Sequence, residues 1–151
     1  MKILIMGLPG SGKTYLAERL QPLIDAAWYN ADVVRNMAND WDFSSEGRIR
    51  QSMRMKTFAD FEKSNNRCVI CDFVCPTAKT RENFDPDIII WMNTISEGRF
   101  EDTNQMFEEP KEVNFHITEM NDTNHHNIAK EILKNVWLEK TNCSNARKVA
   151  T

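Results

Sequence analysis

The chain has 151 residues, of which 41% are hydrophobic and 27% are charged. This length suits one domain, and the hydrophobic fraction indicates a packed core rather than a disordered chain. Nineteen basic residues against 22 acidic ones give a net charge of −3, so the general electrostatic attraction to nucleic acid is absent. No apolar run approaches the about 20 residues of a membrane span, and the first one is too short for a signal peptide. We therefore expect a soluble cytoplasmic protein with no membrane partner.

The cysteine spacing gives little support for a metal site. Cys68 and Cys71 form a C-x-x-C pair, but a zinc site of this type needs a second ligand pair. Cys143 lies far along the chain in a polar segment, and the histidines show no metal-binding spacing. We expect the cysteines, Cys75 included, to be reduced and free.

The first elements in chain order surround a glycine-rich segment. Residues 2–6 form a short apolar run, which indicates a buried strand. A helix is expected at 12–21, where Pro22 ends the helical pattern. A second strand is expected at 24–29 and a short helix at 33–39.

A long helix follows, with Ser44 and Ser45 as candidate N-caps. Its end is expected near residues 64–66, where turn-forming residues dominate. Its larger apolar residues recur near helical spacing, which predicts that they form the buried face. These residues are Ile49, Met53, Phe58 and Phe61.

The remaining pattern predicts three more strands, at 67–74, 87–92 and 113–117, and then an amphipathic helix. The apolar residues of that helix are Ile128, Ile132, Leu133 and Val136. Apolar strands that alternate with helices are typical of a parallel sheet covered on both faces. We therefore expect one three-layer α/β/α domain over residues 1–140 with a mostly parallel five-stranded sheet. The polar tail at 141–151 should be frayed, because it has little to bury.

Residues 7–14 fit the phosphate-binding pattern G-x-x-x-x-G-K-[ST] at every fixed position, between a strand and a helix. Glycines let the backbone N–H groups curl toward phosphate oxygens, and the helix N-terminus adds the positive end of its dipole. This context predicts a P-loop NTPase fold that binds ATP, with Lys13 at the β- and γ-phosphates and Thr14 on Mg²⁺. The predicted ATP-binding residues are Gly7, Leu8, Pro9, Gly10, Ser11, Gly12, Lys13 and Thr14.

A carboxylate follows the second predicted strand, at the sheet edge where ligands of such folds bind. Asp32 could accept the proton of an attacking hydroxyl or orient that hydroxyl, which makes it the candidate catalytic base beside Lys13. Arg35 follows about one helical turn later and could clamp an anionic acceptor. The alternative is a helix-capping aspartate with a solvated arginine.

Together with the phosphate motif, these segments resemble adenylylsulfate kinases, which phosphorylate the 3′-hydroxyl of adenosine 5′-phosphosulfate. Residues 30–35 are similar to the family's D-G-D-N-V-R, residues 43–51 to its L-G-F-S-E-E-D-R-I-E-N, and residues 100–108 to its F-T-G-I-D-x-P-Y-E. The resemblance implies a role in sulfate assimilation, with an aromatic ring stacked on the acceptor's adenine and two arginines on its phosphosulfate. The implied substrate-binding residues are Phe43 for stacking, Arg35 and Arg48 for the anion, Gln51 in an asparagine's place and Phe107 in a tyrosine's place.

The chain departs from that family pattern in three places, one of which is Thr77-Ala78 where the family has Tyr-Arg after an S-P pair. Asn30 replaces the first aspartate of D-G-D, so Asp32 must act alone. The family's R-D-x-K-G-L-Y lid helix is missing, because residues 93–99 lead almost directly to Phe100. A lid excludes water and supplies positive charge, so Arg99 is the candidate substitute and a different small acceptor stays open.

Two other functions remain open. The N-x-D-x-x-R turn and Asp72 at the end of the third strand are similar to 5′-hydroxyl polynucleotide and nucleoside kinases. Asp72 resembles a Walker B carboxylate that would hold Mg²⁺, although a structural turn aspartate is the alternative. The acidic net charge argues against a polynucleotide acceptor, and a nucleotide-binding protein without transferase activity is the third alternative. We predict an ATP- and Mg²⁺-dependent kinase of a small nucleotide. Whether the protein forms a homodimer stays open.

Overall fold

Five parallel strands form one sheet in the order β2-β3-β1-β4-β5 in the computed structural model, which describes the backbone of residues 1–149 and the side chains of residues 1–136. The strands are β1 (Lys2–Met6), β2 (Ala27–Asn30), β3 (Val69–Asp72), β4 (Ile88–Met92) and β5 (Phe115–Ile117). The helices are α1 (Lys13–Ile24), α2 (Ala31–Ala38), α3 (Ser45–Ser64), α4 (Ala78–Phe84), α5 (Glu101–Met106) and α6 (Asn124–Val149).

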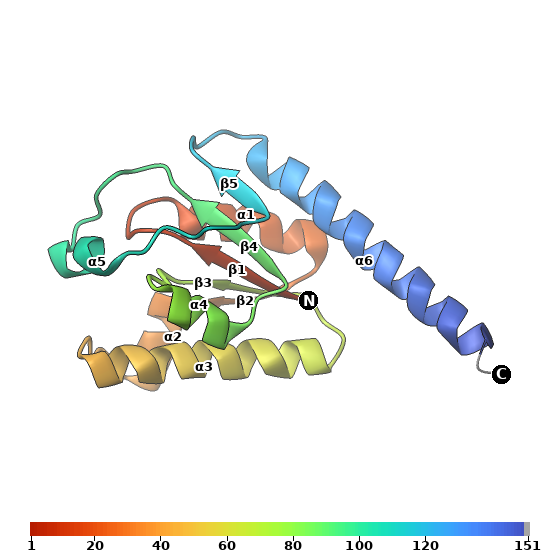
Figure 1. Cartoon of the computed structure of the whole chain (residues 1–151), viewed down its shortest axis with the longest axis horizontal. Coiled ribbons are helices and arrows are strands. Elements are labelled where there is room, and N and C mark those ends of the chain that lie inside the picture. Colours follow the sequence, from red (N-terminus) through yellow and green to blue (C-terminus); the bar gives the residue numbers. More distant parts are fainter. Residues whose placement is uncertain (150–151) are drawn as a thin grey trace.

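Helices cover both faces of the sheet (Figure 1). On one face, α1 and α6 bury their apolar side chains against the sheet, whereas α2, α3 and α4 pack on the other. The central strand β1 is fully buried, and its side chains alternate between the two cores: Ile3 and Ile5 in one, Leu4 and Met6 in the other. This arrangement confirms the predicted three-layer α/β/α fold, and the sheet is parallel throughout.

Helix α1 continues past Pro22, so the prediction that this proline ends the helix is wrong. Leu20 and Ile24 are buried on either side of it and hold the last turn against the sheet. The helix stops at Asp25, whose left-handed backbone directs its N–H to the carbonyl of Gln21. The second strand therefore begins at Ala27, three residues later than expected.

Helix α3 lies with a different face inward from the one predicted. Ser44 caps it as expected, but Ile49, Met53 and Phe61 are 65%, 51% and 62% exposed. Of the predicted apolar face, only Phe58 packs inward, stacked on Tyr29. The buried positions are Gly47, Gln51, Met55, Ala59 and Glu62.

Two short helices were not expected from the pattern. Helix α4 starts at a Thr77 cap whose hydroxyl accepts from the Thr80 N–H, and α5 buries none of its residues. Both are shorter than the windows in which helical periodicity can be recognised.

Helix α6 buries Ile128 and Ile132, but Leu133 is 46% exposed, so its assignment to the apolar face is wrong. The backbone stays helical through Val149. Fraying of residues 141–151 stays a prediction, since those side chains and residues 150–151 lie outside the described part.

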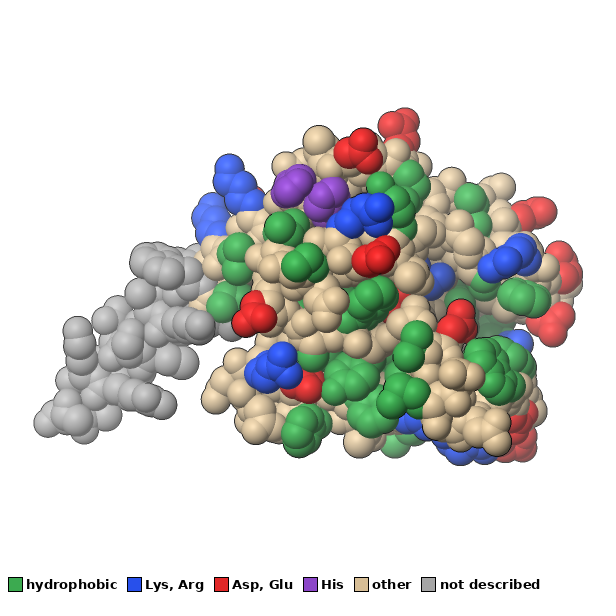
Figure 2. All heavy atoms as spheres, turned by 180° about the vertical axis from the view of Figure 1, so that it is seen from behind, with side chains coloured by type: hydrophobic (Ala, Val, Ile, Leu, Met, Phe, Trp, Pro, Cys, Tyr) green, Lys and Arg blue, Asp and Glu red, His purple; other side chains and the backbone are tan. Residues whose placement is uncertain are grey.

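The surface carries a mixture of charges, as the nearly balanced numbers of acidic and basic residues predict. Acidic and basic side chains are interspersed over the face drawn in Figure 2. Among residues 1–149, no helix combines the length and the apolar character needed to cross a membrane. Within the described part of the chain, no disulfide joins Cys68, Cys71 or Cys75, and burial raises the pKa of the Cys71 and Cys75 thiols. Cys143 lies outside the described side chains.

Candidate active site at the phosphate-binding loop

The phosphate-binding loop, residues 7–14 and hereafter the P-loop, links the buried end of β1 to the start of α1. Gly12 caps α1 with a left-handed backbone at φ +98°, and no side chain caps the first turn. The N–H groups at this helix start are therefore left to an anion, which the helix dipole also favours. Gly7 has no room for a side chain, because an added Cβ would lie 2.5 Å from the carbonyl oxygen of Met92.

Lys13 folds back over this loop. Its Nζ donates to the carbonyl oxygens of Gly7 and Leu8, both at 3.0 Å. Burial lowers the pKa of Lys13 to about 8, although the carboxylates of Asp72 and Asp32 oppose the shift. A phosphate group at this position would supply the negative charge that the carbonyls provide only in part.

Asp72 is the centre of a buried polar cluster at the end of β3. Its Oδ2 accepts from Thr14 Oγ1 at 3.1 Å and from Asn30 Nδ2 at 2.9 Å, and its Oδ1 accepts from Trp28 Nε1 at 2.8 Å. Burial raises the pKa of Asp72, and these hydrogen bonds oppose the rise. Strands β2 and β3 place Asn30 and Asp72 directly opposite each other in register.

The oxygens of Thr14 and Asp72 fit a magnesium ion. Mg²⁺ prefers oxygen ligands in an octahedron at about 2.1 Å, which places neighbouring ligands about 3 Å apart. The 3.1 Å between Thr14 Oγ1 and Asp72 Oδ2 matches this spacing. The two side chains could therefore hold the ion directly or through water.

Asp32 lies in the first turn of α2 with its side chain exposed, and its negative charge opposes the lowering of the pKa of Lys13 and Arg35 that burial causes. Asn30 precedes it as the N-cap, and its Oδ1 accepts from the Val33 N–H at 3.0 Å. The predicted capping role thus belongs to Asn30, which leaves the Asp32 carboxylate beside the P-loop.

The side chains of Arg35 and Phe43 lie against each other. Arg35 is buried, and its Nη1 donates to the carbonyl oxygens of Asp40 and Asp42 at 2.8 and 3.2 Å. Its guanidinium carbon lies 4.4 Å from the centre of the Phe43 ring. Phe43 remains 56% exposed, so its ring is available to a planar ligand.

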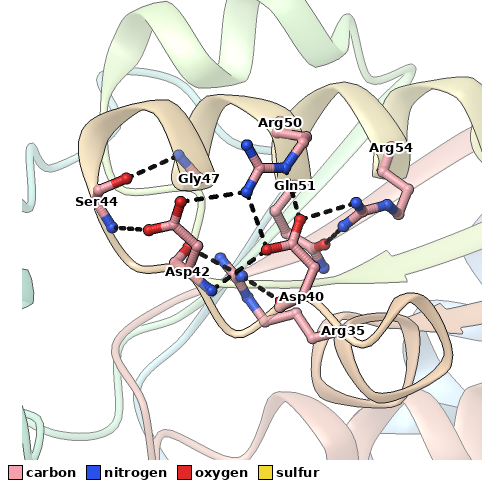
Figure 3. A network of polar contacts seen from close by, with 8 residues as sticks. All are labelled: Arg35, Asp40, Asp42, Ser44, Gly47, Arg50, Gln51 and Arg54. Carbon is pink, nitrogen blue, oxygen red and sulfur yellow. Dashed lines mark hydrogen bonds and ion pairs between the residues drawn. The ribbon is translucent and has the colours of Figure 1, made fainter.

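A network of charges holds the loop that carries Phe43 (Figure 3). Asp40 accepts from Arg50 at 2.7 Å and from Arg54 at 2.9 Å, and these bonds hold the pKa of Asp40 well below its usual range. Gln51 donates to the carbonyl of Ala31 at 3.0 Å and accepts from Arg54 at 2.6 Å. Both ends of the Gln51 amide therefore already have protein partners.

Sequence comparison identifies the family. A model of the family described as adenylylsulphate kinase matches residues 1–89. The chain belongs to the adenylylsulphate kinase family. A protein of Aeropyrum pernix named probable adenylyl-sulfate kinase is 35% identical over 86 residues, which cover 51% of this chain and 45% of that protein. The match thus spans less than half of this relative.

Solved structures of adenylylsulphate kinases share the fold. The APS kinase of Mycobacterium tuberculosis in complex with AMPPNP and APS superposes with a TM-score of 0.64 at 16% identity, covering 88% of this chain and 95% of that one. A hexameric APS kinase from Thiobacillus denitrificans gives a TM-score of 0.67 at 20% identity over 91% of this chain and 29% of that one. At this identity the likeness concerns the fold alone.

The segment where adenylylsulphate kinases are expected to have a lid helix is non-helical here at residues 93–100. It lies against the P-loop instead: Thr94 Oγ1 donates to the Ser11 carbonyl at 2.7 Å, and Gly98 packs on Pro9. Asn104 of α5 bonds both the N–H and the carbonyl of Gly98. Arg99 is exposed on this segment.

Arg48 and Phe107, which the family resemblance had selected, lie toward α5. Arg48 reaches Met106 with Nη1 3.4 Å from the sulfur. Phe107 packs on Trp91 with ring centres 6.5 Å apart. It borders a cavity of about 200 Å³ beside Leu8 of the P-loop. Sequence reasoning missed Trp28 and Thr94, because neither belongs to a motif.

Proposed function

We propose that the protein transfers the γ-phosphoryl group of ATP to a hydroxyl of a small anionic nucleotide, with the 3′-hydroxyl of adenylylsulfate as the favoured acceptor. The observation that carries the proposal is the convergence of Lys13, Asp32 and Asp72 at one end of the sheet, where each carboxylate acts on the charge of the lysine. Positioning and charge neutralisation supply most of the catalysis of phosphoryl transfer.

The P-loop N–H groups would bind the ATP phosphates, and Lys13 would leave the carbonyls of Gly7 and Leu8 for the β- and γ-phosphate oxygens. Thr14 and Asp72 would hold Mg²⁺, which neutralises phosphate charge when it is bound. Both oxygens are already aligned, so little reorganisation is needed when the nucleotide arrives.

In the transfer step, the acceptor oxygen forms a bond to the γ-phosphorus while the bond to the bridging oxygen of ADP breaks. Asp32 would take the proton of the acceptor hydroxyl, and ADP would leave with the bonding electron pair. Phe43 would stack on the acceptor's base, and Arg35 and Arg48 would bind its anionic group. Gln51 would act by bracing Ala31, at the start of the helix that carries Asp32.

A 5′-hydroxyl polynucleotide or nucleoside kinase is the second candidate, favoured by the pairing of Asn30 with Asp72. A long anionic acceptor would need a basic surface, but Arg50 and Arg54 are already paired with Asp40 and Asp42. We therefore keep the small nucleotide as the proposed acceptor. We also propose that the protein is cytoplasmic and that it forms a homodimer.

The test is ADP release by the purified protein with ATP and Mg²⁺, measured with adenylylsulfate, with adenosine and with a 5′-hydroxyl oligonucleotide. We expect adenylylsulfate to stimulate ADP release by the wild-type protein, with the 3′-phosphorylated product identified by ³¹P NMR. The Lys13→Ala variant should release no ADP with any acceptor. Stimulation by the oligonucleotide alone would favour the second candidate. Thermal stabilisation by ATP without turnover of any acceptor would favour a non-catalytic nucleotide-binding protein.

A further inference from the structure

We propose that Trp28 is a positioning residue that fixes the Asp72 carboxylate for the metal ion beside the nucleotide phosphates. The inference rests on the proposed function. Trp28 lies half-buried on β2, outside both the P-loop and the acceptor turn. Its indole Nε1–H donates to Asp72 Oδ1 at 2.8 Å across the β2–β3 pair.

The two oxygens of Asp72 have separate donors. Trp28 holds Oδ1, whereas Asn30 and Thr14 hold Oδ2, the oxygen that faces the start of α1. Trp28 and Asn30 are two residues apart on one strand, so both side chains point to the same face and reach the same carboxylate. With both oxygens bound, the carboxylate cannot rotate about its terminal bond without losing a hydrogen bond.

Burial makes the indole donor important. Asp72 is 2% exposed, so water has little access to replace a missing donor at Oδ1. A buried carboxylate oxygen without a donor costs free energy and leaves the group free to turn toward another partner. Partners that orient a metal ligand typically contribute 10–100-fold to metal affinity or activity. Trp28 thus gives Oδ2 a fixed direction toward the site of the ion.

The experiment compares two phenylalanine substitutions on adjacent residues of β2. Trp28→Phe keeps an aromatic ring and removes the N–H that reaches Asp72. Tyr29→Phe removes a hydroxyl that donates to Glu62 Oε1 at 3.0 Å, on the opposite face of the sheet. Each variant therefore loses one donor to a carboxylate, but only one of them acts at the proposed metal site.

The readout is ADP binding, measured by calorimetry over a Mg²⁺ series and in EDTA, without turnover. We expect Trp28→Phe to raise the Mg²⁺ concentration for half-maximal ADP binding about tenfold, with ADP affinity in EDTA unchanged. Tyr29→Phe should show the wild-type Mg²⁺ dependence of ADP binding and the wild-type ADP affinity in EDTA. A wild-type Mg²⁺ dependence in Trp28→Phe, or an equal shift in Tyr29→Phe, would overturn the inference.

A second readout needs no substitution. In the wild type, the indole N–H cross-peak of Trp28 should shift when Mg²⁺ is added to the ADP-bound protein, and a signal that does not respond would overturn the positioning role. ADP binding that is independent of Mg²⁺ in the wild type would contradict the proposed function itself. Failure of the inference alone would leave the wild-type Mg²⁺ dependence intact.

Discussion

The guanidinium of Arg35 lies 4.4 Å from the centre of the Phe43 ring, so the candidate anion-binding side chain also supports the candidate base-stacking side chain. Arg35 is fixed by two loop carbonyls before any ligand arrives. An acceptor that carries both a planar base and an anionic group would meet a site in which the two partners are already oriented toward each other.

Replacement of Phe43 by alanine should weaken acceptor binding. Stacking of a base on an aromatic side chain contributes about 1–3 kcal/mol, so we expect the acceptor KM to rise about tenfold or more and the ATP KM to change less than about twofold. Steady-state kinetics with each substrate varied would measure both. Ile49→Ala, at an exposed position of α3, should change neither. An unchanged acceptor KM in Phe43→Ala would contradict the stacking role.

Asp32→Asn should reduce kcat by about 10²–10⁴-fold, because an amide cannot accept the proton of the acceptor hydroxyl. Affinity for ADP with Mg²⁺ should fall little, since the P-loop and Asp72 are unchanged. Asp25→Asn is the matched control, because Asp25 is an exposed residue after α1 with a left-handed backbone that asparagine also adopts. A wild-type kcat in Asp32→Asn would assign the base to another residue.

Acid should loosen the loop that carries Phe43. Hydrogen bonds from Arg50 and Arg54 hold the pKa of Asp40 below its ordinary value, so Asp40 stabilises the fold above the unfolded-state pKa of about 3.9. That contribution is lost as the pH falls through the lower folded-state pKa. The free energy of unfolding should therefore decrease as the pH drops below about 4.

Asp40→Asn should lower the stability at pH 7 and flatten its decrease in acid. Urea denaturation at a series of pH values would measure both effects. The effects of Asp40→Asn and Arg54→Gln should be less than additive, because the two residues share one ion pair. Equal acid slopes for the wild type and Asp40→Asn would remove the role assigned to this carboxylate.

Two methionines of α3 test which face of that helix is buried. Met55 is fully buried and Met53 is 51% exposed, although they are two residues apart. Met55→Ala should cost about 2–5 kcal/mol of unfolding free energy, and Met53→Ala about 0.5 kcal/mol or less. Denaturant unfolding of the two variants would measure the loss of unfolding free energy in each. Similar losses would indicate that α3 is rotated from the orientation described.

Local patterns predicted the sheet and the P-loop, because a buried parallel strand and a glycine-rich phosphate loop each leave a continuous signature in the sequence. The buried face of α3 was predicted wrongly because Gln51 is polar and Gly47 small, yet both are buried. Gly47 is needed because the backbone of Asp42 leaves no room for a Cβ, and the buried amide of Gln51 is satisfied by hydrogen bonds to Ala31 of α2 and from Arg54 of α3. These contacts depend on how the chain folds around α3, so the spacing of apolar residues in the sequence does not reveal them.

The polar cluster around Asp72 could be predicted only in part. Thr14 belongs to a recognised motif, and the end of an apolar strand marked Asp72 as a candidate. Trp28 and Asp72 are joined across two strands, and an indole that donates to a carboxylate looks in the sequence like any other aromatic residue of a strand. Parallel register, rather than composition, brings these residues together.

Calorimetric titration with AMPPNP and Mg²⁺, for the wild type and for Lys13→Ala, tests the account most directly. The wild type should bind one nucleotide per chain, and loss of Lys13, which we expect to contact the phosphates, should weaken binding by about 100-fold or more. Thermal unfolding of both proteins would check that the variant is folded. Equal affinity in the two proteins would contradict the assignment of residues 7–14 as the phosphate site.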